Sequence, residues 1–166
     1  MSARIAKPSS DAIASVIEQL TRGPEIVRRL IYEVPLERRK RRPAPGVWSA
    51  HEHAVHLPAV HPLIHRRLDL MLAEPAPYIK GYEPSHDEPD DALLKLDLDS
   101  EMDRFDRDRV ALIDRIRKLT PDEWAITAAH EEYENYGVYT MFRHIALHDI
   151  HHAYKIEDRL LRKQWD

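Results

Sequence analysis

Four histidines lie within nine positions near the C-terminus, at His144, His148, His151 and His152. In an α-helix, residues four positions apart lie one turn apart on the same side, so His148 and His152 would face the same way. Two neutral imidazoles at that separation can bind one metal ion, as paired histidines do in zinc-binding helices. A third histidine would complete a site with an open coordination position, which is the arrangement of catalytic metal centres.

The same segment also has an interpretation without metal. On a helical projection, His148 and His152 fall within an apolar stripe, and His144 and His151 fall at or beyond its edge. The stripe also contains Met141, Ile145 and Ile156. A buried imidazole needs a partner for each polar nitrogen, and polar core neighbours can supply one as well as a metal can. The segment alone leaves both interpretations open.

A helix that begins near Ser49 offers two candidates for the third ligand. Ser49 and Glu52 form an S-x-x-E capping box, in which each side chain satisfies a free backbone N–H. Helical periodicity places His53 and His56 in one apolar stripe and does not choose between them. The other histidines of this region are predicted to be exposed: His51, His61 and His65.

Prolines and glycines divide the chain into four main helices. Residues 10–34 are predicted to form one long helix broken at Gly23 and Pro24, or two short helices. Pro58 and Pro62 each remove a helix hydrogen bond, so a kink is expected just after His56.

The third helix and the connections follow from caps and composition. Ser100, with Asp103 three positions later, is predicted to cap the third helix. Thr120, Pro121 and Glu123 are typical of the start of a short helix. Residues 74–98 are a long polar connection with a short helix expected near 91–96, and residues 125–139 are expected to form a loop. The cation-rich residues 37–42 are interpreted as a solvated turn.

Length and composition favour one all-helical domain over residues 1–166. A third of the residues are charged (33%), and only four are glycine. Cysteine is absent, so a metal site must use histidine and carboxylate ligands, and any reacting thiol must come from another molecule. The formal net charge of -4 gives no general attraction to nucleic acid. The sequence holds no membrane span or signal peptide, so we expect a cytoplasmic protein without nucleic-acid or membrane partners.

Two further features lie on the third and last helices. Arg109 falls in the middle of an apolar stripe. It is either structural, snorkelling past the core or pairing with a buried carboxylate, or it anchors an anion at the mouth of a metal pocket. The last helix has a second apolar side, formed by Leu147, Ile150, Tyr154 and Leu161. A helix with two apolar sides is central in a bundle or lies at a subunit interface, so a homodimer is predicted.

The ordered set of motifs resembles the DinB/YfiT-like superfamily. The motifs are Trp48-Ser49-x-x-Glu52-x-x-x-His56-Leu57, then His148-Asp149-x-x-His152 with Ile156. Pro43-Ala44-Pro45-Gly46 and Asp122-Glu123-Trp124 also match the usual run of the family. The resemblance covers nearly the whole chain.

The resemblance implies an all-α four-helix bundle, up-down-down-up and often dimeric, with a divalent metal held by three histidines. Carried over by position, these ligands are His56, His148 and His152, a choice that selects His56 over His53. Known family activities are linked to thiols: transferases that use bacillithiol or mycothiol, a maleylpyruvate isomerase, and relatives in ergothioneine synthesis. Lys155 stands where the family often has Gln, which argues against thiol transfer in particular.

The sequence therefore predicts a divalent-metal-dependent enzyme with a small-molecule substrate, either a thiol-dependent S-transferase or a hydrolase. Zinc, nickel, manganese and iron all accept imidazole ligands, so the metal is not specified. His53, His144 and Asp149 are candidates for supporting the ligands or transferring protons, and no catalytic residue is assigned. The alternatives are a non-catalytic, stress-related bundle that binds a metal or ligand, and a helical dimer whose buried histidines bind only protein groups.

Overall fold

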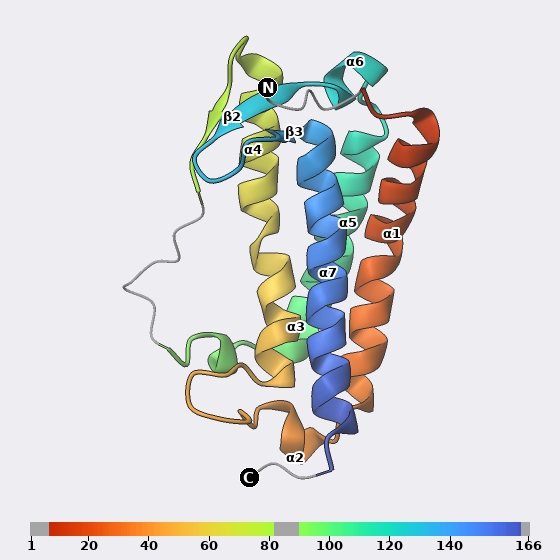
Figure 1. The fold of residues 1–166 in the computed structure, drawn as a ribbon. Coiled ribbons are helices and arrows are strands. Elements are labelled where there is room, and N and C mark those ends of the chain that lie inside the picture. The colour runs from red at the N-terminus through yellow and green to blue at the C-terminus, as the bar shows by residue number, and fades with distance from the viewer. Residues whose placement is uncertain (1–6, 82–89, 164–166) are drawn as a thin grey trace.

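Four long helical segments run side by side along the molecule (Figure 1). A computed structural model describes residues 7–81 and 90–163. The segments are α1 (Ser10–Glu33), α3 (Ala50–Ala59) continued by α4 (His61–Ala73), α5 (Leu98–Ile116), and α7 (Val138–Leu161). Helices α1 and α7 run one way, and α3–α4 and α5 run the other way, which confirms the predicted up-down-down-up four-helix bundle. Both α5 and α7 pack against α1 and α3.

Short elements close the two ends of the bundle (Figure 1). One end carries α2 (Leu36–Arg39) and the 3-10 helix η1 (Leu93–Lys95), which lies where a short helix was predicted. The other end carries α6 (Pro121–Trp124) and a small sheet of β1 (Tyr78–Ile79), β2 (Thr127–His130) and β3 (Tyr136–Gly137). Strand β2 is central, parallel to β1 and antiparallel to β3.

The expectation of a loop over residues 125–139 is therefore wrong. The strands are too short to give a periodic pattern, and they form because tertiary packing brings their edges together. Gly137 allows the closest approach, because a Cβ at this position would overlap the carbonyl oxygen of Ile126. The Val138 N–H donates to that same oxygen at 3.0 Å, where α7 begins.

The predicted capping box at the start of α3 is confirmed. The Ser49 N–H donates to Glu52 Oε2 at 2.8 Å, and the Glu52 N–H donates to Ser49 Oγ at 3.3 Å. Buried Glu52 also pairs with Arg42 at 2.5 Å. Lys40 Nζ donates to the carbonyl of Leu94 at 2.6 Å. The cation-rich segment is thus not simply a solvated turn, because Arg42 and Lys40 fasten it to α3 and η1.

Helix α5 begins earlier than predicted. Its N-cap is Asp97, whose side chain accepts the Ser100 N–H at 2.9 Å, so Ser100 lies inside the first turn instead of capping it. Both residues are of capping type, and starting at Asp97 lets Leu98 pack against the adjacent core. The predicted Thr120 and Glu123 capping box at the start of α6 is present with both of its bonds.

Helix α1 continues through Gly23 and Pro24, so the predicted break is wrong. Proline lacks the N–H that would bind the carbonyl four residues earlier, which here belongs to Leu20. Arg109 Nη1 supplies the missing donor and binds the Leu20 oxygen at 2.8 Å. A tertiary contact from α5 therefore compensates for the proline, and sequence periodicity along α1 carries no sign of it.

The kink predicted after His56 is confirmed as the junction between α3 and α4. Pro62 cannot donate to the carbonyl of Pro58, and the Nδ1 of His61 lies 3.3 Å from that oxygen. His61 is only 2% exposed, and His51 is only 1% exposed. The prediction that both are exposed is wrong, because each ring binds a carbonyl; His51 Nε2 lies 3.1 Å from the Leu93 oxygen.

A buried polar layer crosses the middle of the bundle. Arg109 and Asp149 form a two-pronged ion pair, with Nη1–Oδ2 at 2.5 Å and Nη2–Oδ1 at 3.1 Å. Arg109 Nε also donates to His61 Nε2 at 3.1 Å. Gly23 lies directly beside this pair, because a Cβ there would overlap the Asp149 carboxylate. Of the two interpretations of Arg109, the structure shows pairing with a buried carboxylate.

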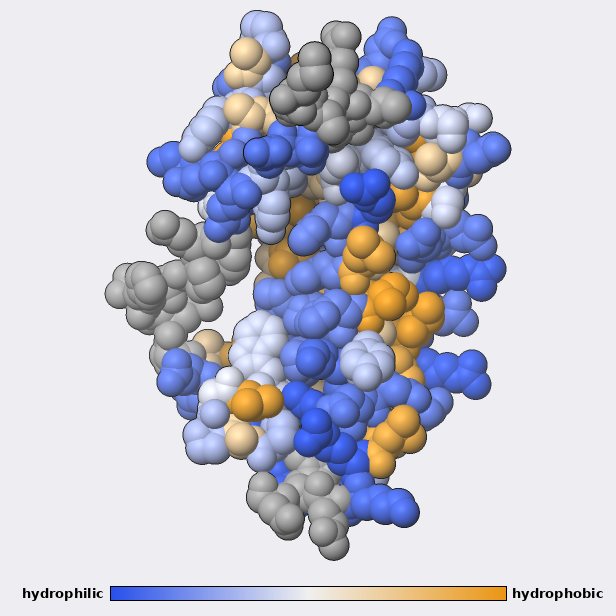
Figure 2. Space-filling model, viewed as in Figure 1, coloured by the Kyte–Doolittle hydropathy of each residue, from blue (hydrophilic) through white to orange (hydrophobic). Residues whose placement is uncertain are grey.

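Exposed apolar side chains gather on the face formed by α7 and α1 (Figure 2). On α7 they are Leu147, Ile150, Tyr154 and Leu161, which are 57%, 42%, 68% and 68% exposed. A single chain therefore leaves this side of α7 uncovered, and the homodimer stays a prediction that sedimentation velocity would test. Among the helices that the structure describes, none combines the length and apolar character that a bilayer span requires.

Removing one partner of the ion pair between Arg109 and Asp149 should destabilise the fold. We expect Arg109→Met to lower the free energy of unfolding by about 3–5 kcal/mol, because it leaves the Asp149 charge buried without a partner. Arg109→Met combined with Asp149→Leu should cost much less than the sum of the single changes, although the Leu20 carbonyl stays unpaired. Urea unfolding measures all three variants.

The control for this cycle is Arg29→Met, at an exposed arginine of α1 that pairs with Glu33 across one turn. It should change the free energy of unfolding by less than ~0.5 kcal/mol. Additive costs for the two core substitutions would show that Arg109 and Asp149 do not act as a pair.

Candidate metal centre

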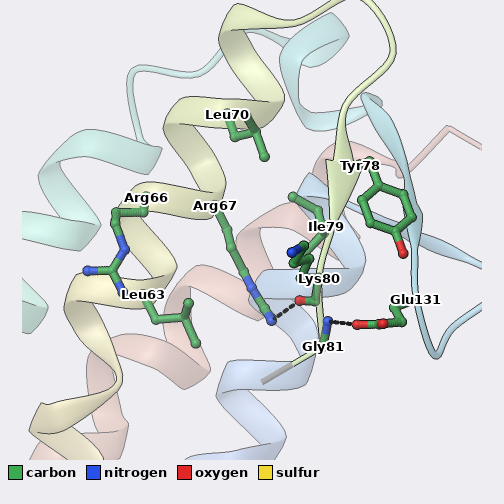
Figure 3. Close-up of a pocket in the computed structure, with 9 residues that line it drawn as sticks. All are labelled: Leu63, Arg66, Arg67, Leu70, Tyr78, Ile79, Lys80, Gly81 and Glu131. Atoms are coloured by element: carbon green, nitrogen blue, oxygen red, sulfur yellow. Dashed lines mark hydrogen bonds between the residues drawn. The ribbon is translucent and has the colours of Figure 1, made fainter. Parts of the chain in front are cut away.

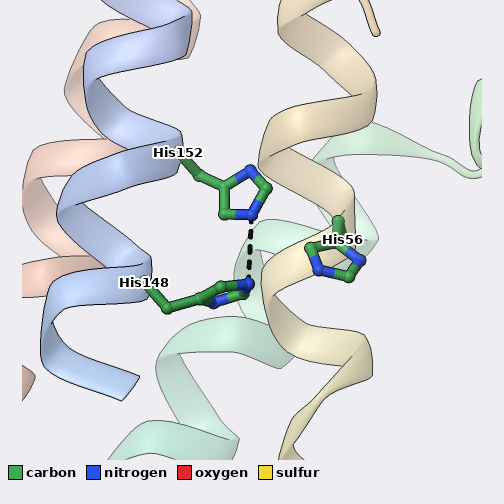
Figure 4. A group of neighbouring side chains, drawn as sticks. All are labelled: His56, His148 and His152. Atoms are coloured by element: carbon green, nitrogen blue, oxygen red, sulfur yellow. Dashed lines mark hydrogen bonds between the residues drawn. The ribbon is translucent and has the colours of Figure 1, made fainter. Parts of the chain in front are cut away.

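Helices α3 and α7 bring together the three histidines named as ligands (Figure 4). His56 lies on α3, and His148 and His152 lie one turn apart on α7. Each ring offers a nitrogen, and these three nitrogens all lie within 4.8 Å of one another. The Nε2 atoms of His148 and His152 are 3.1 Å apart. Two nitrogens bound tetrahedrally to one ion at ~2.0–2.1 Å would be ~3.3 Å apart, so the spacing suits a shared metal.

Trp48 packs over the histidine cluster at its α3 side. Its ring centroid lies 5.0 Å from that of His56 and 6.0 Å from that of His152, with the second pair stacked. The backbone of Trp48 is held against α7, because Arg159 Nε donates to its carbonyl at 3.2 Å. Sequence reasoning gave Trp48 no role at the site; its place directly before the capping box was the available signal.

The environment keeps the three imidazoles neutral. Burial, together with repulsion from neighbouring histidines, lowers the pKa of His152 to about 2 and that of His148 to about 3. Burial alone lowers the pKa of His56. Metal ligation requires the unprotonated ring, so near neutral pH the cluster is already in the form that binds a cation.

The hydrogen bonding of the cluster is incomplete among the residues that the structure describes. His148 Nδ1 is buried and has no hydrogen-bond partner there. A buried polar nitrogen without a partner costs free energy, and the only described partner of each Nε2 of His148 and His152 is the other Nε2. The donor set is three imidazoles without a carboxylate, which suits the borderline metals named above. The residues therefore fit a divalent metal ion.

His53 contacts His152 through a ring nitrogen. The Nδ1 atoms of the two rings are 2.9 Å apart, and burial lowers the pKa of His53 to about 4. When His152 turns an unprotonated Nε2 toward a cation, its proton is on Nδ1 and is donated to His53 Nδ1. A hydrogen bond of this kind fixes the ring orientation and tautomer of a metal ligand.

The remaining candidates lie apart from the cluster. Both oxygens of Asp149 accept bonds from Arg109, and neither residue is exposed by more than 2%. The structure thus places Asp149 and Arg109 in the polar layer of the core. His144 is exposed on α7, one turn before His148, with its ring centroid 6.3 Å from that of Tyr133.

Comparison with known proteins places the chain in a family. The model of the DinB superfamily matches residues 19–156, and the chain belongs to this superfamily. No curated protein matches the chain significantly.

A solved structure, that of YfiT from Bacillus subtilis, is similar along its whole length. The match has a TM-score of 0.78 and 17% sequence identity, and covers 100% of this chain and 95% of that one. That protein is described as a probable metal-dependent hydrolase with an unusual four-helix bundle topology. At this level of identity the likeness shows the shared fold.

Removing the hydrogen bond from His53 should weaken metal binding. We expect His53→Phe to lower affinity for zinc or nickel about 10–100-fold, because His152 loses the acceptor that orients it. His53→Gln, whose amide oxygen can accept the same proton, should recover part of the loss. Competition with a colorimetric chelator at fixed pH gives the affinities.

The exposed neighbour His151 on α7 provides the control, and His151→Gln should bind metal as the wild type does. Wild-type affinity in a folded His53→Phe variant would show that His53 does not support the ligand.

The metal-free protein should lose stability as pH falls below 6.5. In this range the unfolded chain takes up protons on histidines that the folded chain keeps neutral, since the folded pKa values of His148 and His152 are about 3 and 2. Each such histidine removes up to ~1.4 kcal/mol per pH unit until its folded pKa is reached.

Urea unfolding in EDTA at pH 7.5, 6 and 5 measures this dependence. The variant His148→Leu should show a shallower slope, by about one proton, and Arg29→Met should match the slope of the wild type. Equal wild-type stability at pH 7.5 and 5 would contradict the neutral burial of the cluster.

Proposed function

We propose that this member of the DinB superfamily is a divalent-metal-dependent hydrolase whose ion is held by His56, His148 and His152. The observation that carries the proposal is the convergence of three neutral imidazoles from α3 and α7. Three protein ligands leave a coordination position for another group, which is the pattern of catalytic centres, whereas structural zinc centres use four. A bound divalent ion there would lower the pKa of water or of a thiol, or polarise a carbonyl group.

The protein's own residues supply orientation and partial exclusion of solvent. His53 holds the ring of His152 through the Nδ1–Nδ1 contact. Trp48 covers His56 and His152 on one side, and its contact with Arg159 fixes it to α7. His56 and His148 are only partly buried, so solvent and a small substrate can reach the cluster.

Hydrolysis is favoured over thiol transfer by two observations. The similar structure of YfiT is described as a probable metal-dependent hydrolase. In this chain Lys155 occupies the position three residues after His152, where the family often has Gln. The second candidate function is transfer of a low-molecular-weight thiol to an electrophile; the chain lacks cysteine, so the thiol would be a cosubstrate.

Metal analysis of protein purified without a histidine tag or a nickel column tests the first part of the proposal. We expect one equivalent of a divalent metal, lost in His56→Ala with the fold retained. Removal of the metal with EDTA should lower the melting temperature of the wild type, because a ligand that binds only the folded state stabilises it. Absence of metal, with a melting temperature indifferent to EDTA, would leave a bundle whose histidines bind only protein groups.

Turnover separates the remaining candidates. A panel of amides and esters should be hydrolysed by the metal-loaded wild type and not by His56→Ala. Conjugation of bacillithiol or mycothiol to an electrophile, without hydrolysis, would identify the thiol transferase. Bound metal with neither activity would favour a non-catalytic metal-binding bundle.

A further inference from the structure

A cavity that is separate from the histidine cluster lies between α4 and β1 (Figure 3). Its volume is about 740 Å³, and none of the three histidines lines it. Its apolar wall is formed by Leu63, Leu70, Tyr78 and Ile79. Arg66, Arg67, Lys80, Gly81 and Glu131 complete the lining. Both α4 and β1 thus contribute apolar side chains to this cavity, and its polar lining is mainly cationic.

The lining carries three cationic side chains and one carboxylate. The carboxylate of Glu131 is held in place by the backbone N–H of Gly81, which donates to Oε2 at 2.9 Å (Figure 3). The lining therefore keeps a net positive charge in a chain whose formal net charge is -4. A concave surface of one charge sign attracts ligands of the opposite sign.

Arg67 is fixed in the cavity by neutral partners. Its Nη2 donates to the carbonyl of Lys80 at 2.8 Å, and its Nη1 lies 3.2 Å from the hydroxyl of Tyr136. The guanidinium carbon also lies 5.9 Å from the centre of the Tyr136 ring. None of these contacts neutralises the positive charge, although they hold the guanidinium in one orientation.

Two other partly buried arginines, Arg42 and Arg115, form ion pairs instead. Arg42 pairs with Glu52, and Arg115 pairs with Asp69. Among the residues that the structure describes, Arg67 makes no such ion pair. The charge of Arg67 affects a neighbouring ring: burial lowers the pKa of His130, and the charge of Arg67 lowers it further. The guanidinium has five N–H donors, and its two described hydrogen bonds leave others for a ligand.

We propose that this cavity binds an amphipathic organic anion, with a carboxylate or phosphate group on Arg67 and Lys80 and an apolar body against Leu63, Leu70 and Ile79. The planar fork of arginine matches two oxygens of either group, and a fixed fork loses little freedom on binding. The apolar wall selects an aliphatic or aromatic body over a free inorganic anion. This site does not depend on the metal centre.

Calorimetric titration of the metal-free protein with benzoate, phenyl phosphate and neutral benzyl alcohol tests the proposal. We expect at least one of the two anions to bind more tightly than the alcohol, and the tighter of the two identifies the acidic group. Inorganic phosphate should bind more weakly than phenyl phosphate, because it lacks the apolar body.

Two variants at the cavity and one control locate the binding. Arg67→Met should weaken binding of the preferred anion about tenfold or more, because a charge-assisted pair is lost. Lys80→Met should weaken anion binding less. This variant removes only the side-chain charge and leaves the main-chain carbonyl of residue 80, which accepts the bond from Arg67, in place. Arg107→Met, at an exposed arginine of α5, should bind as the wild type does.

The proposal would be overturned if neither anion bound more tightly than benzyl alcohol does. It would also be overturned if the wild type and both cavity variants bound the anions with equal affinity. Measurement in His56→Ala separates it from the proposed function. That variant should lose metal and retain anion binding, so failure of either site is seen independently of the other.

Discussion

The ion pair between Arg109 and Asp149 is the contact on which the arrangement of the bundle depends. It joins α5 to α7, reaches α4 through His61, and reaches α1 through the Leu20 carbonyl. Apolar clusters lie on both sides of it, one toward the sheet end and one toward η1. A buried charged group must stay close to its partner, because separating the two destabilises the fold far more than shifting an apolar contact does. The layer therefore fixes how the four helices are rotated and staggered.

This constraint also sets the histidine cluster. Asp149 directly follows His148, so a helix that turns Asp149 toward the centre of the bundle must turn His148 and His152 toward α3. His61 links the polar layer to the junction that ends α3, because it binds both Arg109 and the Pro58 carbonyl. The break after His56 is thus held by the same polar layer that orients α7. The position of the His56 imidazole therefore follows from the packing of the core.

Sequence reasoning succeeded where the determinants are local. Helical spacing placed His148 and His152 together, capping boxes marked α3 and α6, and the prolines marked the junction after His56. Family resemblance was needed to choose His56, because His53 shares its stripe and indeed lies against His152. The failures came where distant residues decide. Pro24 remains helical only because Arg109 replaces its missing donor, and His51 and His61 are buried only because carbonyls elsewhere receive them.

The hydrogen bonds of the buried histidines indicate that the histidine cluster has a function beyond packing. His51 and His61 show how this bundle buries a structural histidine: each ring nitrogen for which a bond is described binds a main-chain oxygen or an arginine. In the cluster, by contrast, the described hydrogen bonds of His148 and His152 run only to other histidines, and His148 Nδ1 has none. Buried imidazoles that hydrogen-bond only to one another, with pKa values far below neutrality, destabilise the fold unless another group binds them. A cation is the partner that neutral nitrogens converging from two helices are suited to hold.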